Sequence, residues 1–113
     1  MPASLRLEAW ARRVADAFGH HPYQVGSSVF GREWRDVDVR LILPDDEFDA
    51  LFPGDGSQDY RDPRWALLCD ALSELGRVQT GLPIDFQFQR TTEANEEFTG
   101  PRSALGLLAV RGG

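Results

Sequence analysis

Two stretches, DVDVRLIL at residues 36–43 and PIDFQFQ at residues 83–89, decide the fold of this chain. Both alternate polar and apolar residues, which is the pattern of a β-strand with one buried face. Asp36 and Asp38 share one side of the first strand. In the second strand, Asp85 points to the side away from its two phenylalanines. If both strands belong to one sheet whose apolar face is covered by helices, the three aspartates emerge together on its open polar face.

Helices are predicted on both sides of these strands in the sequence. Residues 4–18 place apolar side chains at steps of three and four, and Gly19 follows as a stop. A second helix is expected to begin with Asp62 as its N-cap and Pro63 in its first turn, and to end at Gly76. The expected buried stripe of this second helix is Trp65, Leu68, Cys69, Leu72 and Leu75.

The remaining segments carry weaker patterns. Residues 23–28 are typical of a short strand that runs into a glycine-serine turn, and residues 44–61 of an acidic loop with one short helical turn. In the tail we expect a helical turn near Glu93 and a strand within 104–110. The order of elements predicts a small α+β domain over residues 1–113, with a mixed β-sheet and helices packed on one face.

Composition limits both the size of the fold and the class of partner. A chain of 113 residues with 42% hydrophobic content can bury one modest core, so we expect a single domain. Twelve basic residues against 18 acidic ones give a net charge of −6, the wrong sign for an extended nucleic-acid groove. An acidic chain can still handle a nucleoside triphosphate, because metal ions held by carboxylates neutralise the phosphates locally.

The same sequence bears on the compartment. No apolar stretch approaches the length needed to cross a bilayer, and the N-terminus does not resemble an export signal. Cys69 is the one cysteine, which excludes an internal disulfide and a multi-cysteine zinc site. We therefore expect a cytoplasmic protein without membrane contacts.

Three converging carboxylates have a specific physical requirement. Without a cation between them Asp36, Asp38 and Asp85 would repel one another, and the usual relief is a hard divalent metal with oxygen ligands, such as Mg²⁺. The alternative is that these acids simply occupy a water-facing side of the sheet in an acidic chain. The pattern of the two strands leaves both interpretations open.

The segment VGSSVFGREWRDVDV at residues 25–39 resembles the signature of the nucleotidyltransferases of the DNA polymerase beta superfamily. That family has a strand ending in Gly-Ser or Gly-Gly, a short connection, an acid-apolar-acid pair on the next strand and a third acid on a later strand. Gly26 and Ser27 match the turn, and Asp36 and Asp38 match the pair. Asp85 matches the third acid, so the resemblance implies a nucleotidyltransferase-like fold and covers about residues 22–90.

The resemblance also implies a reaction and its parts. The backbone at Gly26 and the hydroxyls of Ser27 and Ser28 would hold the outer phosphates of a nucleoside triphosphate. The paired aspartates and Asp85 would bind Mg²⁺ or Mn²⁺, and Asp85 could accept the proton of the incoming hydroxyl. The implied reaction is attack on the α-phosphorus, which transfers a nucleoside monophosphate to an acceptor and releases pyrophosphate.

Two arginines depart from the family pattern, since Arg35 directly precedes the acid pair and Arg40 follows two positions after it. Arg40 shares the face of the aspartates, where it either contacts a phosphate or forms a salt bridge that fills the site without metal. In size the chain is similar to the minimal nucleotidyltransferases, many of which act beside a small helical protein as antitoxins. The second hypothesis is therefore a catalytically silent domain that serves as a binding or regulatory module, such as the antitoxin partner of a helical protein.

Overall fold

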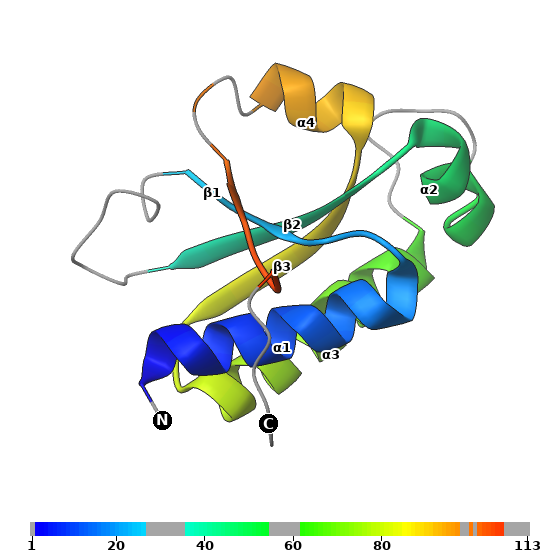
Figure 1. Cartoon of the computed structure of the whole chain (residues 1–113). Coiled ribbons are helices and arrows are strands. Elements are labelled where there is room, and N and C mark those ends of the chain that lie inside the picture. Colours follow the sequence, from blue (N-terminus) through cyan, green and yellow to red (C-terminus); the bar gives the residue numbers. More distant parts are fainter. Residues whose placement is uncertain (1, 27–35, 55–61, 98–99, 101, 108–113) are drawn as a thin grey trace.

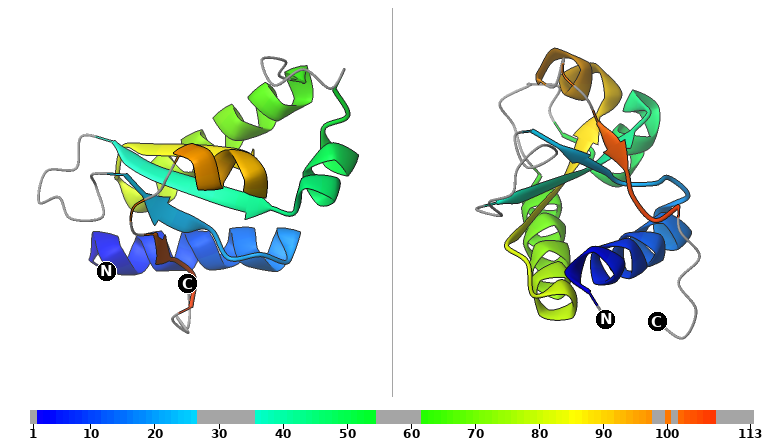
Figure 2. Two further views of the ribbon diagram at one scale, coloured as in Figure 1. Left: turned by 90° about the horizontal axis from the view of Figure 1, so that it is seen from above. Right: turned by 60° about the vertical axis from the view of Figure 1, so that its left-hand side comes forward.

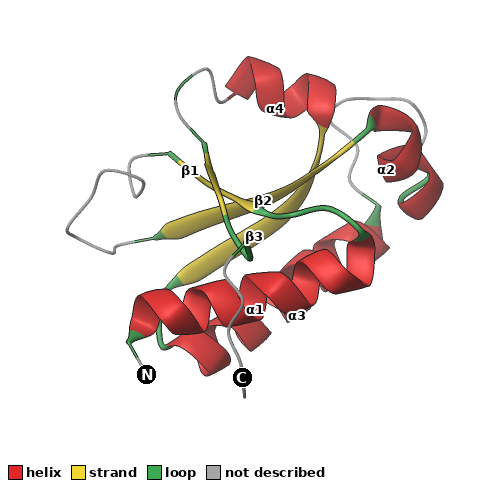
Figure 3. Ribbon diagram, in the orientation of Figure 1, coloured by secondary structure: helices red, strands yellow, loops and turns green. Residues whose placement is uncertain are grey.

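The computed structural model describes residues 2–26, 36–54, 62–97, 100 and 102–107. Within them the chain forms four helices and four strands (Figures 1 and 3). In chain order these are α1 Ala3–Phe18, β1 Tyr23–Val25, β2 Val37–Leu43, α2 Asp45–Leu51, α3 Pro63–Thr80, β3 Ile84–Arg90, α4 Thr91–Glu97 and β4 Ser103–Ala104.

The strands form one mixed sheet in the order β3-β2-β1-β4. β1 is antiparallel to both β2 and β4, whereas β2 and β3 are parallel. In this register Asp38 lies opposite Val25 on one side and opposite Asp85 on the other. The α+β class and the mixed sheet expected from the sequence are confirmed.

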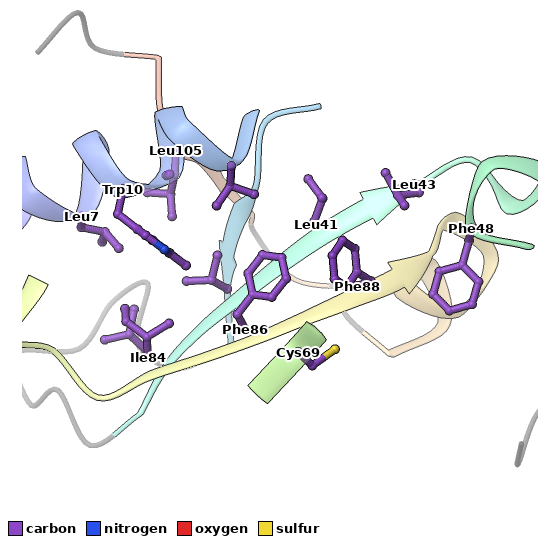
Figure 4. Close-up of a cluster of buried hydrophobic side chains, with 14 of the residues drawn as sticks. Leu7, Trp10, Leu41, Leu43, Phe48, Cys69, Ile84, Phe86, Phe88 and Leu105 are labelled. Atoms are coloured by element: carbon purple, nitrogen blue, oxygen red, sulfur yellow. The ribbon is translucent and has the colours of Figure 1, made fainter. Parts of the chain in front are cut away.

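The two longest helices, α1 and α3, cover one face of the sheet and enclose the core with it (Figures 1 and 2). The aromatic rings of the core interlock, since Phe86 makes edge contacts with both Trp10 and Phe88 at centroid distances of 5.9 and 5.1 Å (Figure 4). The other members of this cluster include Leu7, Ala11, Val14, Val37, Val39, Leu41, Leu43, Phe48, Phe52, Cys69, Ile84 and Leu105.

The fourth helix departs from the expectation that helices pack on one face only. α4 lies on the opposite face of the sheet from α1 and α3 (Figure 2). It begins directly after β3 and is tied down at its start, where the Thr91 hydroxyl donates to the carbonyl of Leu43 at 2.8 Å. Ala94 of this helix is fully buried. Part of the face that carries the aspartates is therefore covered as well.

Local sequence explains where the long helices begin and end. α1 ends at Gly19, whose φ of 80° is the left-handed conformation that glycine adopts without strain. α3 begins after Asp62, whose side chain accepts a hydrogen bond from the backbone N–H of Arg64 at 2.8 Å, and Pro63 occupies its first turn. None of the helices in the described ranges combines the length and the apolar character needed to cross a membrane.

The expected end and buried stripe of the second helix were wrong in part. α3 continues through Gly76 and ends at Gly81, which has a φ of 75°. Trp65 and Leu72 are partly buried against the core as expected, but the buried positions of α3 carry small and polar side chains. Ser73, for example, exchanges hydrogen bonds with the backbone of Phe86 at 2.8 and 3.2 Å. The residues buried along α3 are Cys69, Ser73, Gly76 and Thr80, whereas Leu68 and Leu75 are exposed.

Weakly patterned segments are more ordered than the sequence indicated. The acidic stretch after β2 forms two turns of helix as α2, and the region near Glu93 forms α4. The strand expected within 104–110 begins earlier and is short, at Ser103–Ala104, and residues 108–110 lie outside the described part of the chain. β4 is held by pairing with β1, which local sequence cannot specify.

Candidate functional site

The parallel pair β2 and β3 brings two of the predicted aspartates together. Asp38 and Asp85 occupy directly opposite positions in the register of the two strands. Their neighbours Val37 and Ile84 are fully buried on the helix-covered side, so both carboxylates face the other side of the sheet. The side chains of Asp38 and Asp85 are 30% and 45% exposed, which leaves both accessible to a small ligand.

The third aspartate, Asp36, lies just before β2 and is exposed. Burial raises the pKa of Asp38 above its ordinary value, the cation of Arg40 opposes this shift, and the charges of Asp85 and Asp36 add to it. The negative charges of Asp36 and Asp85 thus both act on Asp38.

Gly26, at the end of β1, lies next to these carboxylates. It directly follows β1 and has a φ of 77°, and because β1 is antiparallel to β2 it lies beside Asp38. A Cβ atom placed on Gly26 would come within 3.1 Å of Asp38 Oδ2. Gly26 thus lies against Asp38, one member of the acid pair. Ser27 and Ser28, and also Arg35, lie outside the described residues.

Replacing Gly26 tests whether this close approach matters. Gly26→Ala is expected to destabilise the fold by about 1–2 kcal/mol through left-handed backbone strain, and also to displace the Asp38 carboxylate. Gly19→Ala is the matched control, because Gly19 has a similar φ of 80° with no atom within 4 Å of its added Cβ. Both variants should show a similar loss in urea unfolding, and only Gly26→Ala should weaken metal-nucleotide binding in calorimetry. Equal metal-nucleotide binding by the two variants would show that Gly26 does not contribute to the site.

Arg40 contacts both Asp38 and Asp85 in this structure. Its side chain is only 6% exposed and extends from β2 to β3, where Nη1 donates to the backbone carbonyl of Asp85 at 2.7 Å. Nη2 lies 3.5 Å from Asp85 Oδ2 and 3.9 Å from Asp38 Oδ1. The guanidinium therefore forms an ion pair with each of the two aspartates that face each other on the strands.

Sequence reasoning missed Glu97, at the end of α4. The buried side chain of Gln89 donates from Nε2 to Glu97 Oε2 at 2.8 Å, and the charge of Glu97 contributes to the raised pKa of Asp38. Gln89 lies on the same face of β3 as Asp85, so strand parity placed it correctly. The helical turn expected near Glu93 could have indicated Glu97, because one further turn of the same helix includes it.

As the side chains are placed, no three acidic, histidine or cysteine residues of the described ranges form a group that could hold a metal ion. A centre shared by Asp36, Asp38 and Asp85 thus stays a prediction. Comparison with protein-family models, with curated proteins and with solved structures finds no match. Function is therefore inferred from the geometry of this chain.

Other ionisable groups are accounted for by the fold. Burial raises the pKa of the Cys69 thiol to about 11, so it is protonated and unreactive at neutral pH. The guanidinium of Arg90 pairs with Asp49 at 2.9 Å, and that of Arg102 donates to the carbonyl of Ala94 at 2.9 Å. Arg90 thus pairs with a residue of α2, and Arg102 with the backbone of α4.

Proposed function

We propose that this chain is a metal-dependent nucleotidyltransferase domain that transfers a nucleoside monophosphate from a nucleoside triphosphate to an acceptor. The observation that carries the proposal is the meeting of three parts at one end of β2. Asp38 faces Asp85 across the parallel strands, and the positive-φ turn at Gly26 lies against Asp38. The order of these parts along the chain is the one that the nucleotidyltransferase resemblance requires.

The chemistry of the donor set fits a hard divalent cation. Carboxylate oxygens are the ligands that Mg²⁺ and Mn²⁺ prefer; Asp38 and Asp85 supply them from adjacent strands, and Asp36, just before β2, would be the third. When bound, such an ion would neutralise the phosphates and lower the pKa of the attacking hydroxyl.

The chain's own residues would perform the other parts of the reaction. The glycine turn lets the backbone approach the outer phosphates of the nucleotide. Asp85 would accept the proton that the attacking hydroxyl loses as its oxygen bonds to the α-phosphorus. In the same reaction the bond between the α-phosphorus and the oxygen that bridges it to the β-phosphorus breaks, and pyrophosphate leaves.

A second candidate function is a catalytically silent domain that keeps this fold as a binding or regulatory module, such as the antitoxin of a small helical protein. The observation that favours it is the ion pairing of Arg40 with both Asp38 and Asp85. A guanidinium that never leaves this position would exclude a metal ion from the same carboxylates.

Calorimetric titration with Mg²⁺ and a non-hydrolysable ATP analogue tests the proposal. We expect Mg²⁺ to bind at least about tenfold more tightly when the nucleotide is present, because its phosphates supply further ligands. Asp38→Asn should remove most of this gain, since it deletes one ligand charge. Asp46→Asn is the matched control, as Asp46 is an exposed aspartate of α2.

A transfer assay with labelled ATP and cell lysate distinguishes the two candidate functions. Label transferred by the wild type but not by Asp38→Asn supports the enzyme. Binding without transfer supports the silent module. No binding at millimolar nucleotide and metal rules out the nucleotidyltransferase proposal.

A further inference from the structure

The buried guanidinium of Arg40 is oriented chiefly by the backbone. Nη1 donates to two carbonyl oxygens, that of Asp85 at 2.7 Å and that of Val39 at 3.1 Å. Both carbonyls belong to β2 and β3, which are paired over their whole length. These two hydrogen bonds hold the arginine on the sheet independently of the aspartate side chains.

The contacts of Arg40 with the carboxylates are looser. Nη2 lies 3.5 Å from Asp85 Oδ2 and 3.9 Å from Asp38 Oδ1, whereas a close charge-assisted hydrogen bond is about 2.7–2.9 Å long. Both carboxylates are also partly exposed. They therefore feel the positive charge of Arg40 and keep oxygen lone pairs available to a further cation.

The surrounding charges explain why a cation is needed at this position. Asp36, Asp85 and Glu97 all act on Asp38 with negative charge, and Arg40 opposes them. A buried cation is stable only beside negative partners, so the two aspartates stabilise the charge of Arg40, while the strand carbonyls fix its position.

We infer that Arg40 is a built-in counter-ion that holds Asp38 and Asp85 together in the absence of metal and competes with a divalent cation for them. Metal alone should bind weakly, because it would approach a fixed positive charge. An anionic ligand such as a triphosphate would offset that charge and make metal binding favourable. The inference rests on the proposed function only in taking a metal-nucleotide complex as that ligand.

Titration with Mn²⁺ in the absence of nucleotide tests the competition directly. Arg40→Met removes the charge and keeps most of the length of the side chain, so we expect Mn²⁺ to bind at least about tenfold more tightly than to the wild type. Arg90→Met is the matched control, since it removes another aspartate-paired arginine, at the end of the same strand pair. Its Mn²⁺ affinity should equal that of the wild type.

Thermal unfolding supplies a second readout. Without its counter-ion the Arg40→Met protein should melt at a lower temperature than the wild type, and Mn²⁺ should raise this temperature more in the variant. Arg40→Gln also removes the charge but keeps a donor for the strand carbonyls, so it extends the test if Arg40→Met does not fold. A Mn²⁺ affinity unchanged by both substitutions would overturn the inference.

The outcomes for Arg40 and for the proposed function are distinguishable. Tighter Mn²⁺ binding by Arg40→Met, with no nucleotide binding by either protein, supports the counter-ion role and contradicts the transferase. Nucleotide-dependent Mg²⁺ binding by the wild type, with no gain of Mn²⁺ affinity in either Arg40 variant, supports the transferase and contradicts the counter-ion role.

Discussion

Phe86→Ala is expected to lower the free energy of unfolding by about 3–5 kcal/mol, a large part of the roughly 5–15 kcal/mol that stabilises a typical domain. Phe86 is 1% exposed, and its ring makes edge contacts with Trp10 of α1 and Phe88 of β3. Truncation would leave a cavity where α1, α3 and the sheet meet, which a close-packed core can fill only in part.

Urea unfolding followed by far-UV circular dichroism measures this loss. Leu67→Ala is the control, because Leu67 is 68% exposed on α3 and its truncation should change stability by no more than about 0.5 kcal/mol. A loss below about 1 kcal/mol for Phe86→Ala would contradict the packing described for the core. Phe86 adjoins Asp85 in β3, so the same variant should also weaken the site through loss of the folded sheet.

Gly76→Leu should destabilise the domain by about 1–3 kcal/mol, although leucine favours a helix over glycine by nearly 1 kcal/mol. A Cβ at this position would lie 3.0 Å from the Trp10 ring and 3.1 Å from Ile84 Cγ2. Both neighbours are buried and have little freedom to move. The larger side chain must therefore separate α3 from α1 and from the sheet.

The control for Gly76→Leu is Ala71→Leu, which enlarges an exposed residue of the same helix. Urea unfolding should show little change for Ala71→Leu and a clear loss for Gly76→Leu. A Gly76→Leu protein as stable as the wild type would mean that the contact between α1 and α3 is looser than the structure indicates.

Gly76 also shows why the end of the second helix was predicted wrongly. Glycine after an apolar helical stretch is typical of a helix end, yet α3 continues through Gly76. Here glycine is needed because the Trp10 ring occupies the space that a side chain would fill. Ser73 and Thr80 are buried because their hydroxyls are hydrogen-bonded, Ser73 to the backbone of Phe86 and Thr80 to the backbone of Gly76 and Leu82. Apolar periodicity ranks leucine above these residues, because it does not include the hydrogen bonds that the fold provides.

The sequence by itself determined the two central strands, the long helices apart from the end of α3, and the shared face of Asp38 and Asp85. These features follow from local rules, namely the two-residue period of a strand, the helical period of α1, and the caps at Gly19 and Asp62.

The tertiary structure alone decided what surrounds the aspartates. The parallel pairing of β2 with β3 set Asp38 opposite Asp85 and placed the Arg40 guanidinium against the Asp85 carbonyl. α4 lies over the polar face and carries Glu97, whose charge acts on Asp38. These contacts join residues far apart in the chain, and their geometry depends on strand register and helix packing, which no local pattern encodes.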